Sequence, residues 1–172
     1  MRVALKLVLI SACALWLSAC STVQRLGAAN DVHALLISIR DNDRVAFDAH
    51  VDREALKREI EARVGDQIAH SKKAESLGDL RSILAPALAK YAGDTLIQPK
   101  VFRQVADFYG YKPDKPIPNA VVIAGALKTM PDGRVCATAK KNGPCVLIFS
   151  HTGGAWRLSG FQGDMSMLRI KL

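Results

Sequence analysis

Apolar residues recur at spacings of three and four through the first two thirds of the chain, the pattern of helices that bury one face. Four such helices are expected, and they begin at Asn30, after Asp52, near Leu80 and at Pro99. Asn30 or Asp31 would cap the first helix, which should end around 41–43. Pro86 should kink or split the third helix, and Gly93 should close it.

After a proline-rich segment the period of the apolar positions changes to two, which indicates β-strands. The expected strands are 120–128, 134–139, 145–151, 155–161 and 165–170. A two-residue loop at Gly153-Gly154 would pair His151 with Trp156, Phe149 with Leu158 and Leu147 with Gly160. The order of elements predicts an α+β fold in which N-terminal helices pack on a curled antiparallel sheet.

The first twenty residues have a different pattern, in which Arg2 and Lys6 precede an apolar stretch. This stretch, 7–17, is shorter than the ~20 residues of a membrane-spanning helix and is typical of a secretory signal. Leu17-Ser18-Ala19-Cys20 resembles the lipobox of bacterial lipoproteins, whose final cysteine is lipidated. The looser match ending at Cys13 would leave four more apolar residues, 14–17, on the mature chain.

These patterns divide the chain into a signal peptide at 1–19, a lipidated N-terminus and tether at 20–29, and one domain at 30–172. Within the domain we expect helices over 30–110, a linker over 111–118 and the sheet over 119–172. The lipobox resemblance implies acylation of Cys20. Because Ser21 follows Cys20, the resemblance also implies sorting to the periplasmic face of the outer membrane.

Composition supports one globular domain, since 49% of the 172 residues are hydrophobic and 23% are charged. The net charge of +8 falls to +6 without Arg2 and Lys6. Residues 20–115 carry 15 basic and 14 acidic residues, whereas residues 116–172 carry 7 and 2. The basic residues of the second part are Lys128, Arg134, Lys140, Lys141, Arg157, Arg169 and Lys171. This excess favours an anionic partner such as phospholipid headgroups, a small anionic ligand or an acidic envelope protein.

Two of the four cysteines remain for pairing once Cys13 leaves with the signal and Cys20 is acylated. Cys136 and Cys145 flank a turn-rich segment, and an exported protein meets an oxidising compartment. We therefore expect a disulfide between opposed positions of a hairpin. Closing so short a loop should stabilise the fold by roughly 2–3 kcal/mol.

Several short sequence segments resemble those of a family of small bacterial exported proteins, domain of unknown function 2939. They lie at 37–43, 50–52, 97–99, 145–149 and 156–158, within a resemblance that covers most of 30–161. The architecture also resembles the cone-like folds of the nuclear-transport-factor-2-like and cystatin-like group. That group contains ligand-binding, assembly and enzymatic members, so it implies no particular activity.

The sequence presents no catalytic or metal-binding constellation. The four histidines, His33, His50, His70 and His151, have no paired spacing, so no metal or cofactor is expected. A cavity, if the cone encloses one, would be lined by His151 beside Trp156, with Asp107 and Tyr109 at its mouth.

We therefore expect a lipid-anchored envelope protein whose domain is a non-catalytic binding or accessory module. Its expected partners are the membrane, through the N-terminal lipid, and an envelope protein or small anionic ligand, but not nucleic acid. Two alternatives stay open. One is a small hydrolase or isomerase with a cavity near His151 and Trp156, and the other is a structural component of an envelope complex.

Overall fold

The computed structural model describes residues 2–69, 80–108, 112, 114–138 and 143–162. In chain order the elements are α1 (Arg2–Asp41), α2 (Arg44–Ala49), α3 (Arg53–Ala69), α5 (Leu80–Leu96), α6 (Pro99–Phe108), α7 (Ala120–Ala126), β1 (Leu127–Thr129), β2 (Val135–Thr138), β3 (Cys145–Thr152) and β4 (Ala155–Phe161). The strands form one antiparallel sheet in the order β1-β2-β3-β4. Helices in the N-terminal part and a sheet in the C-terminal part confirm the α+β class.

Helix α1 is continuous from Arg2, so the expected start at Asn30 is wrong. Residues 20–29, expected as a tether, are helical, and Ala28 and Ala29 are fully buried in the core. Small side chains at these two positions let the helix lie close to the elements packed on it. The end near Asp41 is as expected, because Asn42 is left-handed, with φ 55°, and the amide of Asp43 donates to the carbonyl of Ser38.

The pattern of apolar positions did not predict the short helix α2, yet this helix contributes a large buried side chain to the core. The Asp43 side chain caps it by accepting from the amide of Ala46 at 3.0 Å. Phe47 on this helix is completely buried and meets Phe102 of α6 edge to face, with ring centroids 5.3 Å apart. A six-residue helix with one buried apolar residue is too short to show a helical period.

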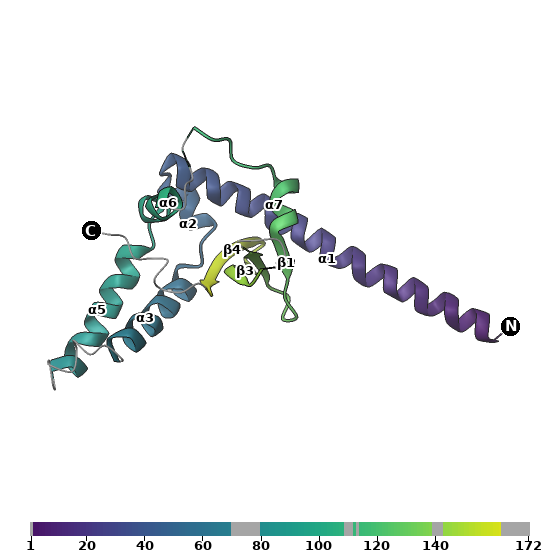
Figure 1. The fold of residues 1–172 in the computed structure, drawn as a ribbon, viewed down its shortest axis with the longest axis horizontal. Coiled ribbons are helices and arrows are strands. Elements are labelled where there is room, and N and C mark those ends of the chain that lie inside the picture. Colours follow the sequence, from purple (N-terminus) through teal and green to yellow (C-terminus); the bar gives the residue numbers. More distant parts are fainter. Residues whose placement is uncertain (1, 70–79, 109–111, 113, 139–142, 163–172) are drawn as a thin grey trace.

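Helices α3 and α5 pack side by side as an arm of the molecule (Figure 1). Asp52 caps α3 through the amide of Ala55, which confirms the expected start. Helix α5 contains Pro86 and runs through Gly93 to Leu96, so Gly93 does not close it. A Cβ at Gly93 would lie 2.9 Å from Cγ of Lys57, so this glycine allows close contact with α3.

The segment expected as the first strand is mostly helical, because α7 occupies 120–126 and only 127–129 pair as β1. Asn119 caps α7 by accepting from the amide of Val122 at 3.0 Å. Ile123 is buried where α7 packs on α1. An all-apolar sequence of seven residues fits either structure, and packing against α1 overrides its strand propensity.

The β3–β4 hairpin confirms most of the expected register. Gly153 and Gly154 both have positive φ, at 64° and 82°, as a type I′ turn requires. The pairs His151 with Trp156 and Phe149 with Leu158 are present. The expected pair of Leu147 with Gly160 is wrong. A bulge between Ile148 and Phe149 places Leu147 opposite Phe161 and Ile148 opposite Gly160.

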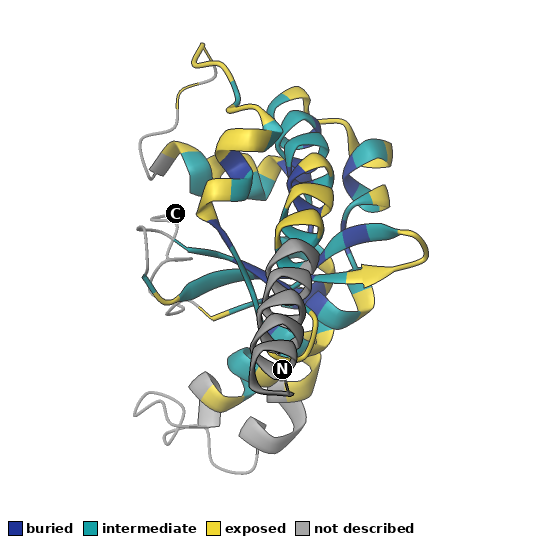
Figure 2. Cartoon of the chain, turned by 90° about the vertical axis from the view of Figure 1, so that its right-hand side faces the viewer, coloured by how far each residue is buried: buried dark blue, intermediate teal, exposed yellow. Residues whose placement is uncertain are grey.

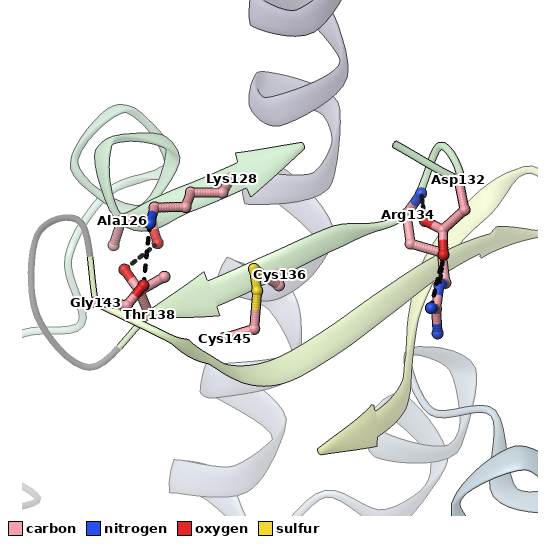
Figure 3. The surroundings of a disulfide bond; sticks show 8 residues. All are labelled: Ala126, Lys128, Asp132, Arg134, Cys136, Thr138, Gly143 and Cys145. Carbon is pink, nitrogen blue, oxygen red and sulfur yellow. Dashed lines mark hydrogen bonds and ion pairs between the residues drawn. A yellow bond between two sulfur atoms is a disulfide. The ribbon is translucent and has the colours of Figure 1, made fainter. Parts of the chain in front are cut away.

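The disulfide joins Cys136 and Cys145 as expected (Figure 3). Their Cα atoms are 5.5 Å apart, but the two residues are diagonal neighbours rather than opposed ones. Cys136 pairs with Ile148 in the register and Cys145 with Thr138, because the pairing shifts between Ala137 and Thr138. The expected strand at 165–170 lies outside the described residues, as do Lys140, Lys141, Arg169 and Lys171.

The inner face of the sheet packs on α1 and α3, and the chain segment after α2 covers the outer edge of β4. The amide of Leu158 donates to the carbonyl of His50, and the amide of Asp52 donates to the carbonyl of Leu158, each at 2.9 Å. Figure 2 looks along α1 from its N-terminal end, with the other elements around the helix. In the parts described, no helix is long and apolar enough to cross a membrane.

Candidate functional site

The strongest polar contacts between α1 and the sheet lie on one face of the helix. The Gln24 amide donates to the carbonyl of Gly133, in the β1–β2 turn, at 2.8 Å. Three residues on, a Cβ at Gly27 would lie 3.5 Å from Nε1 of Trp156. One further turn along, Asp31 accepts a hydrogen bond from the backbone amide of Trp156 at 2.8 Å. Spacings of three and four keep these positions on the side of α1 that faces the sheet.

Asp31 has a second neighbour, His50, which is the residue that ends α2. The other carboxylate oxygen of Asp31 lies 3.6 Å from His50 Nδ1, too far for a hydrogen bond. This nitrogen is buried and has no hydrogen-bond partner among the residues that the structure describes. Asp31 therefore acts mainly as an acceptor for the free amide at the edge of β4, which would otherwise be unpaired. It sits inside α1 and does not cap it.

Two of the expected cavity residues are in contact. The rings of His151 and Trp156 lie 5.2 Å apart at 55°, on directly paired positions of the hairpin. Trp156 is 7% exposed and belongs to the core, whereas His151 is exposed to solvent. Asp107 lies on another element, α6, where it is exposed, and Tyr109 lies outside the described residues.

Arg157 is the basic residue of the sheet whose side chain has no polar partner among the described residues. Its Nε is buried without a partner, and the side chain makes no hydrogen bond or ion pair with any residue that the structure describes. A Cβ at Gly153 would lie 3.7 Å from Nη2 of Arg157, so the guanidinium group reaches the β3–β4 turn. Its strand partner Ser150 shares a 2.7 Å hydrogen bond with Ser159. A guanidinium group beside hydroxyl groups suits an anionic ligand.

The side chains of the other described basic residues of the sheet already bind partners within the protein (Figure 3). Arg134 pairs with Asp132 at 2.6 Å in the β1–β2 turn. Two hydrogen bonds from Arg134 lower the pKa of the Asp132 carboxyl below its ordinary value. The bond from the Arg134 side chain has the larger effect, and the bond from its backbone amide has the smaller one. Lys128 donates to the carbonyl of Gly143 at 3.0 Å. Among the described basic residues of the sheet, Arg157 is therefore the one whose side chain has no hydrogen-bond or ion-pair partner.

Among the residues that the structure describes, no three histidine, cysteine or acidic side chains are placed to hold one metal ion. The sequence patterns did not bring Asp31 and His50 together. His50 lies in the segment 50–52, whose only signal was its similarity to the family. Asp31 was predicted to cap a helix, because the local sequence is the same whether its carboxylate caps that helix or accepts a hydrogen bond from a distant strand.

Removal of the Asp31 carboxylate should destabilise the fold. We expect Asp31→Ala to lower the free energy of unfolding by about 1–3 kcal/mol, because the amide of Trp156 loses its acceptor at 2.8 Å. Urea denaturation followed by circular dichroism measures this change. The matched control is Asp41→Ala, an exposed acid at the C-terminal end of α1, where the helix dipole disfavours a negative charge. Equal stability of both variants would contradict the role assigned to Asp31.

The fold and this region define an α+β protein whose sheet is held against one long helix. The model of a family described as protein of unknown function (DUF2939) matches residues 8–105, more than half of the 172-residue chain. The chain belongs to this family. The match runs from within α1 to within α6, so it includes the segments at 37–43, 50–52 and 97–99 and ends before the sheet. No curated protein and no solved structure matches the chain.

Proposed function

We propose that this protein is a bacterial envelope lipoprotein, acylated at Cys20, whose domain is a non-catalytic binding or accessory module on the periplasmic face of the outer membrane. The observation that carries the proposal is Leu17-Ser18-Ala19-Cys20 directly after a short apolar segment with a basic start. Three acyl chains at one cysteine would hold the protein far more firmly than the marginal binding of a single chain.

The described side chains between Cys20 and the core agree with an anchor at Cys20. None of the side chains at 21–27 is buried, and the buried core begins at Ala28, which follows Cys20 by eight residues. Without residues 1–19, what remains of α1 still spans Cys20 to Asp41 and still carries every contact with the sheet described above.

Metabolic labelling with an alkyne fatty acid in a Gram-negative host tests the lipid anchor. We expect label on the wild-type protein and complete loss of label in Cys20→Ser, because no other residue of the mature chain would be acylated. Cys13→Ser is the matched control, since it removes the cysteine of the looser motif, and it should keep the label. Label on Cys20→Ser, or its loss in Cys13→Ser, would contradict the proposal.

A further inference from the structure

We propose that the sheet end of the domain rests on the anionic phospholipid headgroups of the membrane that holds Cys20. The sheet end consists of the β1–β2 turn at 130–134, the β3–β4 turn at 152–155, and Arg157. This inference rests on the proposed acylation of Cys20 and adds which surface of the domain meets the membrane.

Helix α1 fixes the order in which parts of the domain lie away from Cys20. Gln24, which holds the β1–β2 turn, is four residues from Cys20, or about 6 Å along the helix. Gly27, beside Trp156, is about 10 Å from Cys20. The C-terminal end of α1 at Asp41 is about 30 Å from Cys20. Because the segment is helical and Gln24 already contacts the sheet, little flexible chain separates the anchor from the domain.

The topology of the sheet brings both turns to this end. In a meander of four antiparallel strands, the first and third turns lie at one end of the sheet and the second at the other. The β1–β2 and β3–β4 turns therefore share the end that lies near the first mature turns of α1. Thr138 and Cys145, where β2 ends and β3 begins, lie at the opposite end. Figure 1 shows α2 and α6 at the other end of α1, away from the N-terminus.

The arginines at the two ends of the domain differ in their neighbours. Near the far end of α1, Arg40 pairs with Asp41, and Arg44 and Arg53 both pair with Asp48. Arg103 donates to the carbonyl of Arg40 at the same end. At the sheet end Arg157 has neither an acid nor a carbonyl partner among the residues that the structure describes, and its guanidinium group lies at the β3–β4 turn. A headgroup phosphate can accept hydrogen bonds from that group and supply the missing countercharge.

Exposed apolar residues also lie on α1 close to the proposed anchor. Val23 is 72% exposed and Leu26 is 44% exposed, and both lie on α1 between Cys20 and the buried Ala28. Exposed apolar side chains on a helix are typical of a segment at the boundary between headgroups and acyl chains. Together with Arg157 they favour a membrane surface as the occupant.

Headgroup quenching of a single fluorescent probe tests the orientation. The probe is attached to the intact acylated protein at Thr152→Cys, in the β3–β4 turn, or at Val45→Cys, on α2. Both positions are exposed, and Val45 lies beyond the far end of α1. The vesicles contain phosphatidylcholine and phosphatidylglycerol, and a fraction of the headgroups carries a nitroxide quencher. Flotation of the vesicles measures anchoring separately.

We expect the probe at Thr152 to be quenched at least about twofold more than the probe at Val45, because about 20 Å of helix separates Gly27, beside Trp156, from Asp41. Arg157→Gln, or vesicles of phosphatidylcholine alone, should reduce the quenching at Thr152 toward the value at Val45. The matched control Arg44→Gln removes an exposed charge at the far end and should leave the quenching unchanged.

The outcomes separate this inference from the proposed anchoring. Flotation with equal quenching at the two positions, or with stronger quenching at Val45, would overturn the orientation and leave the anchor standing. Unchanged quenching in Arg157→Gln would overturn the headgroup contact at Arg157. Failure of the folded wild-type protein to float would contradict the lipid anchor itself, and with it this inference.

Discussion

Phe47→Ala should destabilise the protein by about 3–5 kcal/mol, one of the two largest effects that we expect from changes at single sites. Phe47 is completely buried on α2, and its ring meets the ring of Phe102 on α6 edge to face. Truncation leaves a cavity between α2, α6 and the core, and the short helix cannot collapse to fill it. Since small domains are stable by only about 5–15 kcal/mol, much of the stability would be lost.

Urea denaturation followed by circular dichroism measures this loss, and two controls accompany the variant. Val45→Ala removes a side chain that is 84% exposed on the same helix, and it should change the stability by less than about 0.5 kcal/mol. Phe47→Leu keeps most of the volume and should cost about 1.5 kcal/mol or less. A cost for Phe47→Ala no larger than that for Val45→Ala would show that α2 is not part of the core.

Removal of the disulfide is the second large effect. The double variant Cys136→Ala with Cys145→Ala should lose about 2–3 kcal/mol, because the nine-residue separation no longer restricts the unfolded chain. Cys136 is fully buried on β2, so alanine avoids placing a hydroxyl group there. Urea denaturation under oxidising conditions measures the change.

Reduction provides the matched control for this prediction. Wild-type protein unfolded in the presence of dithiothreitol should approach the stability of the double variant, while the double variant itself should not respond to the reductant. A wild-type protein that is equally stable with and without reductant would contradict a structural role for the bond between Cys136 and Cys145.

Local signals in the sequence were sufficient for several elements. Asp52 before a charged and apolar repeat identifies the start of α3, and Pro99 identifies the start of α6. The pair Gly153-Gly154 identifies a two-residue turn, because both residues must adopt positive φ. Each of these features depends on a few adjacent residues, so the sequence alone carries it.

Other elements depend on contacts between distant parts of the chain. Residues 120–126 read as a strand but form α7, because Asn119 caps the segment and α1 covers Ile123. The bulge after Ile148 shifts the end of the hairpin in a way that the alternation of apolar residues does not contain. Asp31 accepts a hydrogen bond from an amide 125 residues away, which no local pattern indicates.

By itself, therefore, the sequence determined the α+β class and the cysteine pair, because both depend on short patterns of composition and spacing. Only the tertiary structure decided that α1 runs unbroken past Cys20 into the core, and which of its residues meet the sheet. The tertiary structure also distinguished Arg157, whose side chain has no polar partner in the described part of the chain, from Arg134, which pairs with Asp132. Such distinctions depend on contacts between residues that are far apart in the sequence, and the packing of helices and strands decides which of these residues come together.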